Sequence, residues 1–92
     1  MDKKRALGAC SREVAFYLCT GQYITTLHQL AMAISATSPQ CFAYHVNSQK
    51  NDFARWARDV FGEEELARRL EQTRERDRTM DIILNRLREL QN

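Results

Sequence analysis

The sequence predicts a mainly α protein: a small bundle of four to five helices, with a short N-terminal β-hairpin over residues 14–25 as one further element. Two observations lead to this fold class. From residue 27 onward, apolar residues recur at the period of a helix that is buried on one face. Helix-capping residues stand at the boundaries of these segments. With 92 residues, the chain is long enough for one hydrophobic core and too short for two.

Length and charge indicate a single helical domain over residues 11–92, preceded by a flexible basic lead-in over residues 1–10. The 14 basic and 12 acidic residues are interspersed and leave a net charge of +2, so no strong field attracts nucleic acid or anionic lipid. No apolar run approaches the roughly 20 residues that cross a bilayer. The apolar stretch after the basic head is too short for a signal peptide. We therefore expect a cytoplasmic protein with no membrane contact.

The three cysteines, Cys10, Cys19 and Cys41, are separated by 9 and 22 residues. One interpretation is a zinc site that joins them with His28 or His45. Zinc ligands usually occur as close pairs, and the sequence has no CxxC or HxxxH pair. Reduced, half-buried thiols are therefore the prediction for a cytoplasmic protein. We predict no metal and no cofactor.

Residues 14–25, VAFYLCTGQYIT, support two interpretations. Their aromatic and β-branched residues alternate and a turn is available at Gly21, which favours a hairpin. The alternative is a helix capped by Ser11, with Val14 and Leu18 on one face and Gly21 at its end.

Two short helices are predicted to follow the hairpin. Thr26 and Gln29 have the spacing of a capping box, and an apolar stripe with helical period comes directly after Thr26. Ser38 is expected to cap the next helix. Pro39 suits the first helical position because its missing N–H has no partner there in any case.

The segment from His45 to Gly62, HVNSQKNDFARWARDVFG, is the most patterned part of the chain. Asn51 or Asp52 is expected to cap a helix with a complete apolar stripe, and such a stripe must be buried. The stripe contains Trp56, the only tryptophan. Gly62 is expected to end the helix in the left-handed conformation that glycine adopts without strain.

The polar residues of this segment have a functional and a structural interpretation. In the first, His45 and Asp52 form an acid–base or ligand pair, but such chemistry also needs a cleft and a nucleophile or metal. In the second, His45 bonds to a backbone carbonyl or to Asp52 and fixes the turn into the tryptophan helix. We favour the structural interpretation and predict no catalytic residue. The predicted structural motif consists of His45, Asn47, Asn51, Asp52, Trp56, Asp59 and Gly62.

Residues 63–92 are predicted to form one charged helix or two. Three glutamates, Glu63 to Glu65, stand at the start, where the helix dipole favours negative charge. Near the end, an apolar stripe has the a/d spacing of a short coiled-coil seam, widened by one leucine. We expect this stripe to be buried, either on the Phe53–Phe61 helix or across a two-fold interface. Its members are Met80, Ile83, Leu84, Leu87 and Leu90.

Three motifs stand out along the chain: F-Y-L-x-x-G at Phe16–Gly21, T-L-x-x-L-A at Thr26–Ala31, and F-x-Y-H-V-N-x-x-K-N-D-F-x-x-W-x-R-D-V-F-G-x-x-x-L-A at Phe42–Ala67. Together they resemble a family of small prokaryotic, often archaeal, helical domains of uncharacterised function. The resemblance covers residues 14–70. It implies a mostly helical fold and no established activity.

Two classes of function remain. The first is a non-enzymatic protein-interaction or regulatory module, with a protein partner or with itself as a homodimer that associates through the C-terminal stripe. The alternative is nucleic-acid binding by a helix-turn-helix-like pair around Gly62, with basic residues such as Arg55 and Arg58 along one side. Glu63 to Glu65 argue against this alternative, because they occupy the front of the recognition helix.

Overall fold

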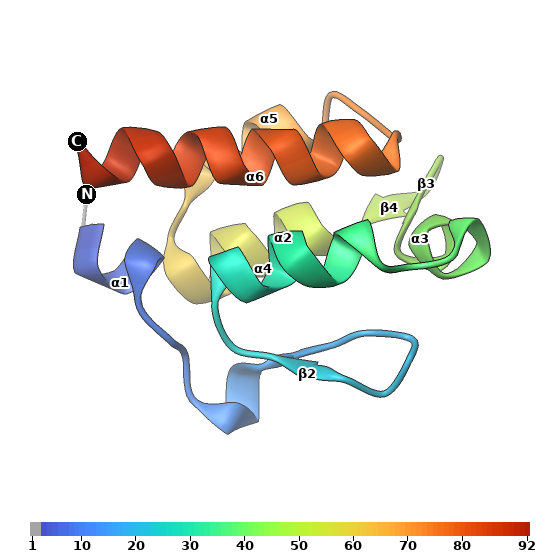
Figure 1. Cartoon of the computed structure of the whole chain (residues 1–92), viewed down its shortest axis with the longest axis horizontal. Coiled ribbons are helices and arrows are strands. Elements are labelled where there is room, and N and C mark those ends of the chain that lie inside the picture. The colour runs from blue at the N-terminus through green and yellow to red at the C-terminus, as the bar shows by residue number, and fades with distance from the viewer. Residues whose placement is uncertain (1–2) are drawn as a thin grey trace.

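A computed structural model describes residues 3–92 of the chain, with side chains from Arg5 onward. The described residues form six α-helices, one 3-10 turn and two antiparallel sheets of two strands each. The mainly α prediction is therefore confirmed. Helix α6 (Arg76–Gln91) lies along one side of the molecule, beside α2 (Leu27–Ser35) (Figure 1). Within the described part of the chain, no helix is long and apolar enough to span a membrane.

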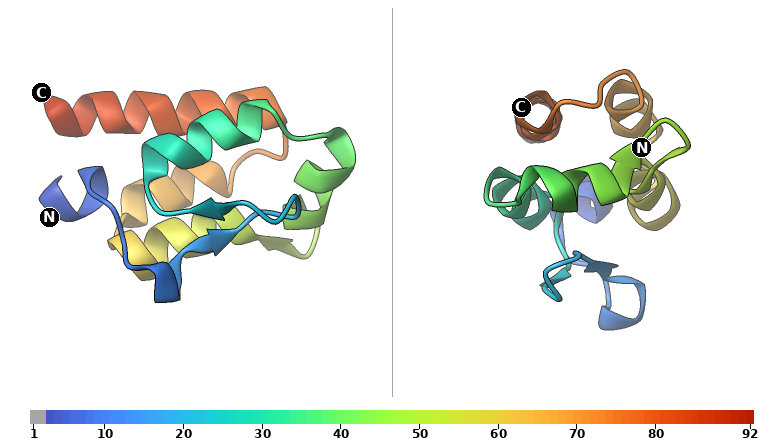
Figure 2. Two further views of the ribbon diagram at one scale, coloured as in Figure 1. Left: turned by 60° about the horizontal axis from the view of Figure 1, so that its bottom comes forward. Right: turned by 90° about the vertical axis from the view of Figure 1, so that its right-hand side faces the viewer.

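The hairpin interpretation of residues 14–25 is confirmed. Strand β1 (Phe16–Tyr17) pairs with β2 (Tyr23–Ile24), and Phe16 lies opposite Ile24. Alternation along each strand buries Phe16 and Ile24 and exposes the two tyrosines. Gly21 supplies the positive φ of 92° in the connecting turn. The 3-10 turn η1 (Arg12–Val14) precedes the hairpin, which lies on the opposite side of the molecule from α6 (Figure 2).

Helices α2 and α3 (Pro39–His45) begin at the predicted caps. The Thr26 hydroxyl accepts a hydrogen bond from the Gln29 N–H at 2.9 Å. The Gln29 side chain accepts from the N–H one residue before the cap, also at 2.9 Å, so the capping box closes one residue earlier than its usual form. The Ser38 hydroxyl accepts from the backbone of the third residue of α3 at 3.1 Å.

A second small hairpin follows α3, formed by β3 (Val46–Asn47) and β4 (Lys50–Asn51). Helix α4 (Asp52–Phe61) follows it without a break. Asn51 caps α4 through its Oδ1, which accepts the N–H of the third helical residue at 3.0 Å. Its Nδ2 donates to the last carbonyl of α5 (Glu64–Leu70) at 3.0 Å, so one side chain joins two helices. Gly62 ends α4 with a φ of 66°, as predicted.

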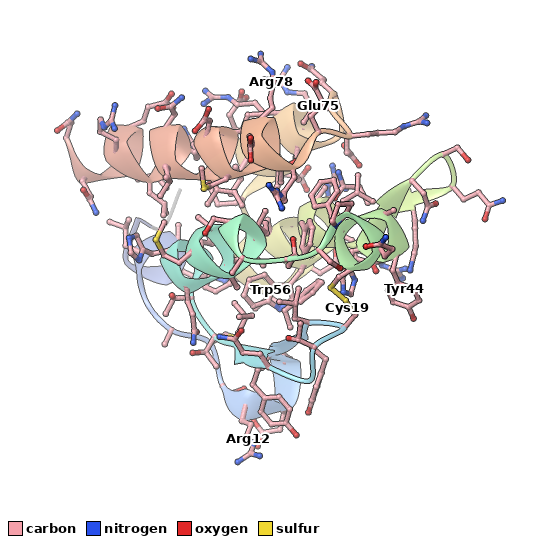
Figure 3. All side chains as sticks on the ribbon, turned by 45° about the vertical axis from the view of Figure 1, so that its right-hand side comes forward. Arg12, Cys19, Tyr44, Trp56, Glu75 and Arg78 are labelled. Atoms are coloured by element: carbon pink, nitrogen blue, oxygen red, sulfur yellow. A yellow bond between two sulfur atoms is a disulfide. The ribbon has the colours of Figure 1, made fainter. Side chains whose placement is uncertain are left out.

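Trp56 is a core residue and 7% exposed, as the structural interpretation expected. Its ring centroid lies 5.7 Å from that of Phe16 and 5.0 Å from that of Phe61. The indole Nε1 donates to the Val14 carbonyl oxygen at 2.7 Å. Trp56 therefore joins α4 to the hairpin segment, between the two in Figure 3.

The C-terminal stripe is buried inside the chain. Ile83, Leu87 and Leu90 are buried, and Met80 and Leu84 are half-buried. The main neighbour of α6 is α2, with α5 and α1 at its flanks, so the expected packing on the Phe53–Phe61 helix is wrong. An apolar stripe requires a cover but does not specify which helix provides it.

Residues 63–92 form two helices, α5 and α6, and a buried ion pair joins the start of α5 to the middle of α6. Glu63 is fully buried, and its carboxylate accepts from Arg86 Nε at 2.7 Å. This ion pair raises the pKa of the Arg86 guanidinium. Glu63 precedes the first residue of α5, where the sequence predicts a favourable interaction with the helix dipole. Its side chain makes no capping hydrogen bond there.

The segment that the sequence predicts as a flexible lead-in contains a short helix. Residues Lys3–Leu7 form helix α1, which contacts α6 and α2. Ala6 is buried in that contact, and Arg5 Nε donates to the Val60 carbonyl oxygen at 3.0 Å. Residues 1–2 of the predicted lead-in lie outside the described part of the chain.

Replacing Trp56 with alanine is expected to lower the free energy of unfolding by about 3–5 kcal/mol, as for other large buried aromatics. Trp56→Phe keeps most of the ring packing and loses the bond to Val14, so we expect about 1–2 kcal/mol. Urea denaturation of both variants measures the two losses. If Trp56→Ala unfolds at the urea concentration of the parent, the indole is not part of the core.

Leu87→Glu is expected to unfold the domain, because it places a charge in the contact between α6 and α2 and costs at least about 3 kcal/mol. Asn85→Glu is the matched control, since Asn85 is exposed on the same helix. Circular dichroism and the mass in solution distinguish the outcomes. A Leu87→Glu protein that stays folded while a parent dimer becomes a monomer would place the stripe in an interface instead.

Candidate functional site

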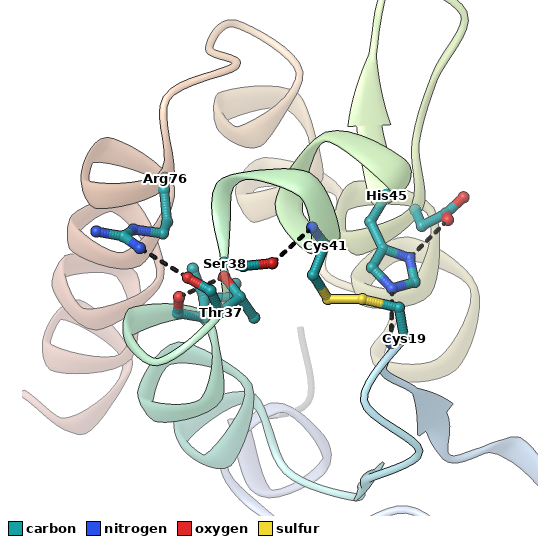
Figure 4. Close-up of a disulfide and its surroundings, with 8 residues drawn as sticks. Cys19, Thr37, Ser38, Cys41, His45 and Arg76 are labelled. Carbon is teal, nitrogen blue, oxygen red and sulfur yellow. Dashed lines mark hydrogen bonds and ion pairs between the residues drawn. A yellow bond between two sulfur atoms is a disulfide. The ribbon is translucent and has the colours of Figure 1, made fainter.

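Cys19 and Cys41 form a disulfide, with Cα atoms 5.9 Å apart (Figure 4). Cys19 follows β1 and is exposed, whereas Cys41 lies in the first turn of α3 and is buried. The prediction of reduced thiols is therefore wrong for these two residues. Their separation of 22 residues concealed the contact, because the chain returns to the hairpin only after passing through α2.

His45 lies beside this pair, is 4% exposed, and uses both ring nitrogens. Its Nε2 accepts a hydrogen bond from the Cys19 backbone N–H at 3.2 Å. Its Nδ1 lies 2.9 Å from Asp52 Oδ2. Because Nε2 accepts, the ring hydrogen is on Nδ1 and is donated to the Asp52 carboxylate. The structure thus shows the expected bond to Asp52 and adds a bond to the hairpin that the sequence did not indicate.

Aromatic rings surround the imidazole. The ring centroids of Phe16, Phe53 and Tyr44 lie 5.0, 5.3 and 5.0 Å from that of His45. Lys50 Nζ lies 2.9 Å from the same Asp52 oxygen that His45 contacts. Asp52 therefore accepts a hydrogen bond from the buried His45 and forms an ion pair with Lys50 at the surface. The apolar wall keeps water away from the imidazole and makes its two bonds hard to replace.

Three potential ligand groups meet at this point. The Cys19 and Cys41 sulfurs and a ring nitrogen of His45 all lie within 4.8 Å of one another. Of the zinc ligands weighed from the sequence, these three come together, while His28 is exposed on α2. Cys10 is half-buried near Val14, and burial raises the pKa of its thiol. Cys10 therefore retains the predicted state of a half-buried thiol.

The other residues of the predicted motif have local structural roles. Asn47 closes the β3–β4 turn: its Nδ2 donates to the Ala43 carbonyl oxygen at 3.1 Å, and its Oδ1 accepts from the Gln49 N–H at 3.0 Å. Asn51 caps α4, as described above. Asp59 is exposed and lies 3.7 Å from Arg55 on the outer face of α4. Neither asparagine is therefore free to orient a substrate at His45.

The helices that meet at Gly62 offer few unpaired charges. Arg58 bonds to Glu64 at 3.0 Å and to Glu71 at 2.9 Å. Glu65 accepts from Arg69 at 2.8 Å and also pairs with Arg68, and these two arginines lower the pKa of its carboxyl group. Nucleic-acid binding by this helix pair gains no support from the geometry, because arginines held by acids are poorly placed to bind phosphates.

The sequence contains one local signal for this site. Cys41 and His45 are four residues apart, and residues at that spacing lie on the same face of a helix. This mixed Cys-x-x-x-His pair differs from the CxxC and HxxxH pairs that usually mark a zinc site. The position of Cys19 had no local signal.

Asp52→Ala is expected to lower the free energy of unfolding by about 1–3 kcal/mol, because it leaves the buried His45 N–H without an acceptor. Asp59→Ala, on the exposed face of the same helix, is the control and should change it by no more than about 0.5 kcal/mol. Both are measured by urea denaturation with the disulfide intact. Equal effects in the two variants would mean that the bond to His45 contributes nothing specific.

A comparison with known protein families matches the part of the chain that carries this site. Residues 9–73 match the model of a family described as a family of unknown function (DUF5752). No curated protein matches the chain, and neither does any solved structure. The matched range holds both hairpins, the disulfide, His45 and Asp52, and it ends before α6. The chain belongs to this family of unknown function, DUF5752.

Proposed function

We propose that this domain is a non-enzymatic regulatory module whose state is set by the Cys19–Cys41 pair. In the disulfide form, a covalent bond holds the hairpin to α3. In the reduced form, the hairpin is held by non-covalent contacts alone. The observation that carries the proposal is this bond itself, because it joins the hairpin to α3 through one exposed and one buried cysteine.

The difference in exposure suggests the order of the exchange reaction. The thiolate of a small thiol such as glutathione attacks the exposed Cys19 Sγ, the S–S bond breaks, and Cys41 leaves as a thiolate that takes up a proton. A second thiolate attacks the external sulfur of the mixed disulfide and releases Cys19. Two small thiols are oxidised to one disulfide, and the protein gains two electrons and two protons. The reverse sequence oxidises the protein.

Reduction is expected to loosen the hairpin without unfolding the domain. Closure of a loop of this length contributes about 3 kcal/mol in the chain-entropy model. The bond from the Cys19 N–H to His45 and the bond from Trp56 to Val14 do not involve sulfur. Both remain available after reduction, so the hairpin keeps its place on the core with a lower barrier to opening.

The outer face of the hairpin suits contact with a protein partner. Tyr17 and Tyr23 are 55% and 38% exposed, and their ring centroids lie 4.4 Å apart. The Arg12 guanidinium carbon is 4.6 Å from the Tyr23 ring centroid. A hydrogen bond from the Arg12 side chain lowers the pKa of the Tyr23 hydroxyl. Tyrosine and arginine are enriched at the centres of protein interfaces. The C-terminal stripe, which the sequence favoured for self-association, is less suitable because its central residues are already buried.

We place this activity in the cytoplasm. Disulfides in cytosolic proteins are usually transient and respond to the thiol pool, which matches a pair that can be opened and closed. In an oxidising compartment the same bond would remain closed and act only as a structural disulfide. The thiol pool of the cytoplasm is therefore the expected input to the module.

The redox proposal is tested by equilibrating the folded chain with mixtures of reduced and oxidised glutathione and trapping free thiols with a maleimide. Mass spectrometry should show Cys19 and Cys41 labelled together, as one two-electron couple, and Cys10 labelled independently. Hydrogen exchange should show faster exchange in residues 16–24 after reduction, with little change in α2 and α6. Cys10→Ser is the control and should behave like the parent.

Two results would contradict this proposal. The first is release of the Cys19 and Cys41 thiols only under conditions that unfold the chain, which would make the bond purely structural. The second is a reduced, folded protein whose hairpin exchanges as slowly as in the oxidised form. A Cys41→Ser variant that stays folded and resembles the reduced parent would support the proposal.

A further inference from the structure

We infer that the reduced Cys19 and Cys41 side chains form a Zn²⁺ site together with His45. The ligand atoms of these three residues lie within 4.8 Å of one another, and they come from the hairpin and from α3. The inference rests on the proposed function in one respect, since both thiols must exist in the folded chain. The disulfide and the metal exclude each other because they use the same two sulfurs.

The donor set fits zinc. Two thiolates and one imidazole form a Cys₂His set, which occurs in proteins with zinc and leaves the fourth tetrahedral position to water or an external ligand. Soft sulfur donors also exclude Mg²⁺ and Ca²⁺, which take oxygen ligands. Because Cys19 is exposed, a small thiol or a side chain of a partner could reach a metal bound here.

Helix geometry brings two of the ligands together. Cys41 and His45 occupy positions i and i+4 of α3, so both side chains project from one face, a turn apart. Cys19 approaches that face from the hairpin, where its N–H already bonds to His45 Nε2. Helix geometry therefore positions Cys41 and His45, and the tertiary fold brings Cys19 to them.

His45 is already oriented as a metal ligand. Its Nδ1 hydrogen is donated to Asp52 at 2.9 Å, which leaves the Nε2 lone pair directed to the side where the sulfurs lie. A carboxylate on the second nitrogen is a usual feature of metal-bound histidines, since it fixes the tautomer and the ring orientation. On binding, Nε2 exchanges the Cys19 N–H for the metal. Asp52 is thus a positioning residue for this site.

Little movement is needed to form the site. With Zn–S bonds of about 2.3 Å, tetrahedral geometry places the two sulfurs about 3.8 Å apart. The Cα atoms are 5.9 Å apart, so rotation of the cysteine side chains can supply this separation. The exposed Cys19 has space to rotate, and the rings of Phe16 and Phe53 keep His45 in place.

The test uses the full chain, reduced, metal-free and kept under anaerobic conditions, with Co²⁺ as the spectroscopic probe. We expect a thiolate-to-cobalt charge-transfer band that saturates at one ion per chain and disappears when Zn²⁺ is added. Cys19→Ser and Cys41→Ser should lose the band, whereas Cys10→Ser should keep it. Asp52→Asn should weaken Zn²⁺ binding by about 10- to 100-fold while the protein stays folded.

The possible failures can be distinguished by counting free thiols in the same samples. Free thiols on a folded chain without a cobalt band would overturn the metal site and leave the redox proposal intact. Thiols that cannot be freed without unfolding would overturn both. Full cobalt binding by Cys19→Ser, or its loss in Cys10→Ser, would place the metal on other ligands and overturn this assignment.

Discussion

The burial of His45 is the constraint on which this half of the molecule depends. An imidazole enclosed by aromatic rings needs a partner for each ring nitrogen, because an unpaired polar group inside a core is costly. The first turn of α4 supplies the Asp52 carboxylate, and the hairpin supplies the Cys19 N–H. Satisfying one side chain therefore fixes the hairpin, α3 and α4 against one another. The same arrangement brings the Cys19 sulfur to Cys41.

The other half of the molecule is organised by α6. This helix covers α2 with its apolar stripe, and its Arg86 neutralises the fully buried Glu63 between α4 and α5. At the start of α6, Arg76 Nη1 donates to the Thr37 carbonyl oxygen at 2.7 Å, just beyond the end of α2. The family match ends at residue 73, so it includes the cysteine–histidine site and excludes this cover. The buried face of α2 nevertheless requires a cover, which in this chain is α6.

The features that the sequence predicted correctly depend on residues close together in the chain. Thr26, Ser38 and Asn51 begin helices because each side chain reaches an N–H three residues ahead. Gly62 ends a helix through its own backbone conformation. The mainly α fold, the first hairpin and the buried Trp56 follow from patterns of similarly short range.

The features that were missed depend on tertiary contacts. The stripe of α6 predicts burial but not α2 as its neighbour, and nothing local shows that Glu63 is buried. The meeting of Cys19 with Cys41 requires the path of the hairpin and of α2. The sequence therefore indicates one part of the site, because the helical spacing of Cys41 and His45 is a local feature. The position of Cys19 beside them depends on the tertiary fold.

The measurement that tests this account most directly is the nitrogen NMR spectrum of the His45 ring in the folded, oxidised chain. We expect a slowly exchanging hydrogen on Nδ1 and no hydrogen on Nε2, because Nδ1 donates to Asp52 and Nε2 accepts from Cys19. The exposed His28 is an internal reference and should show rapid exchange. A hydrogen on Nε2, or a His45 ring that exchanges like His28, would show that Nε2 does not accept from Cys19 and that His45 does not hold the hairpin, α3 and α4 together in this way.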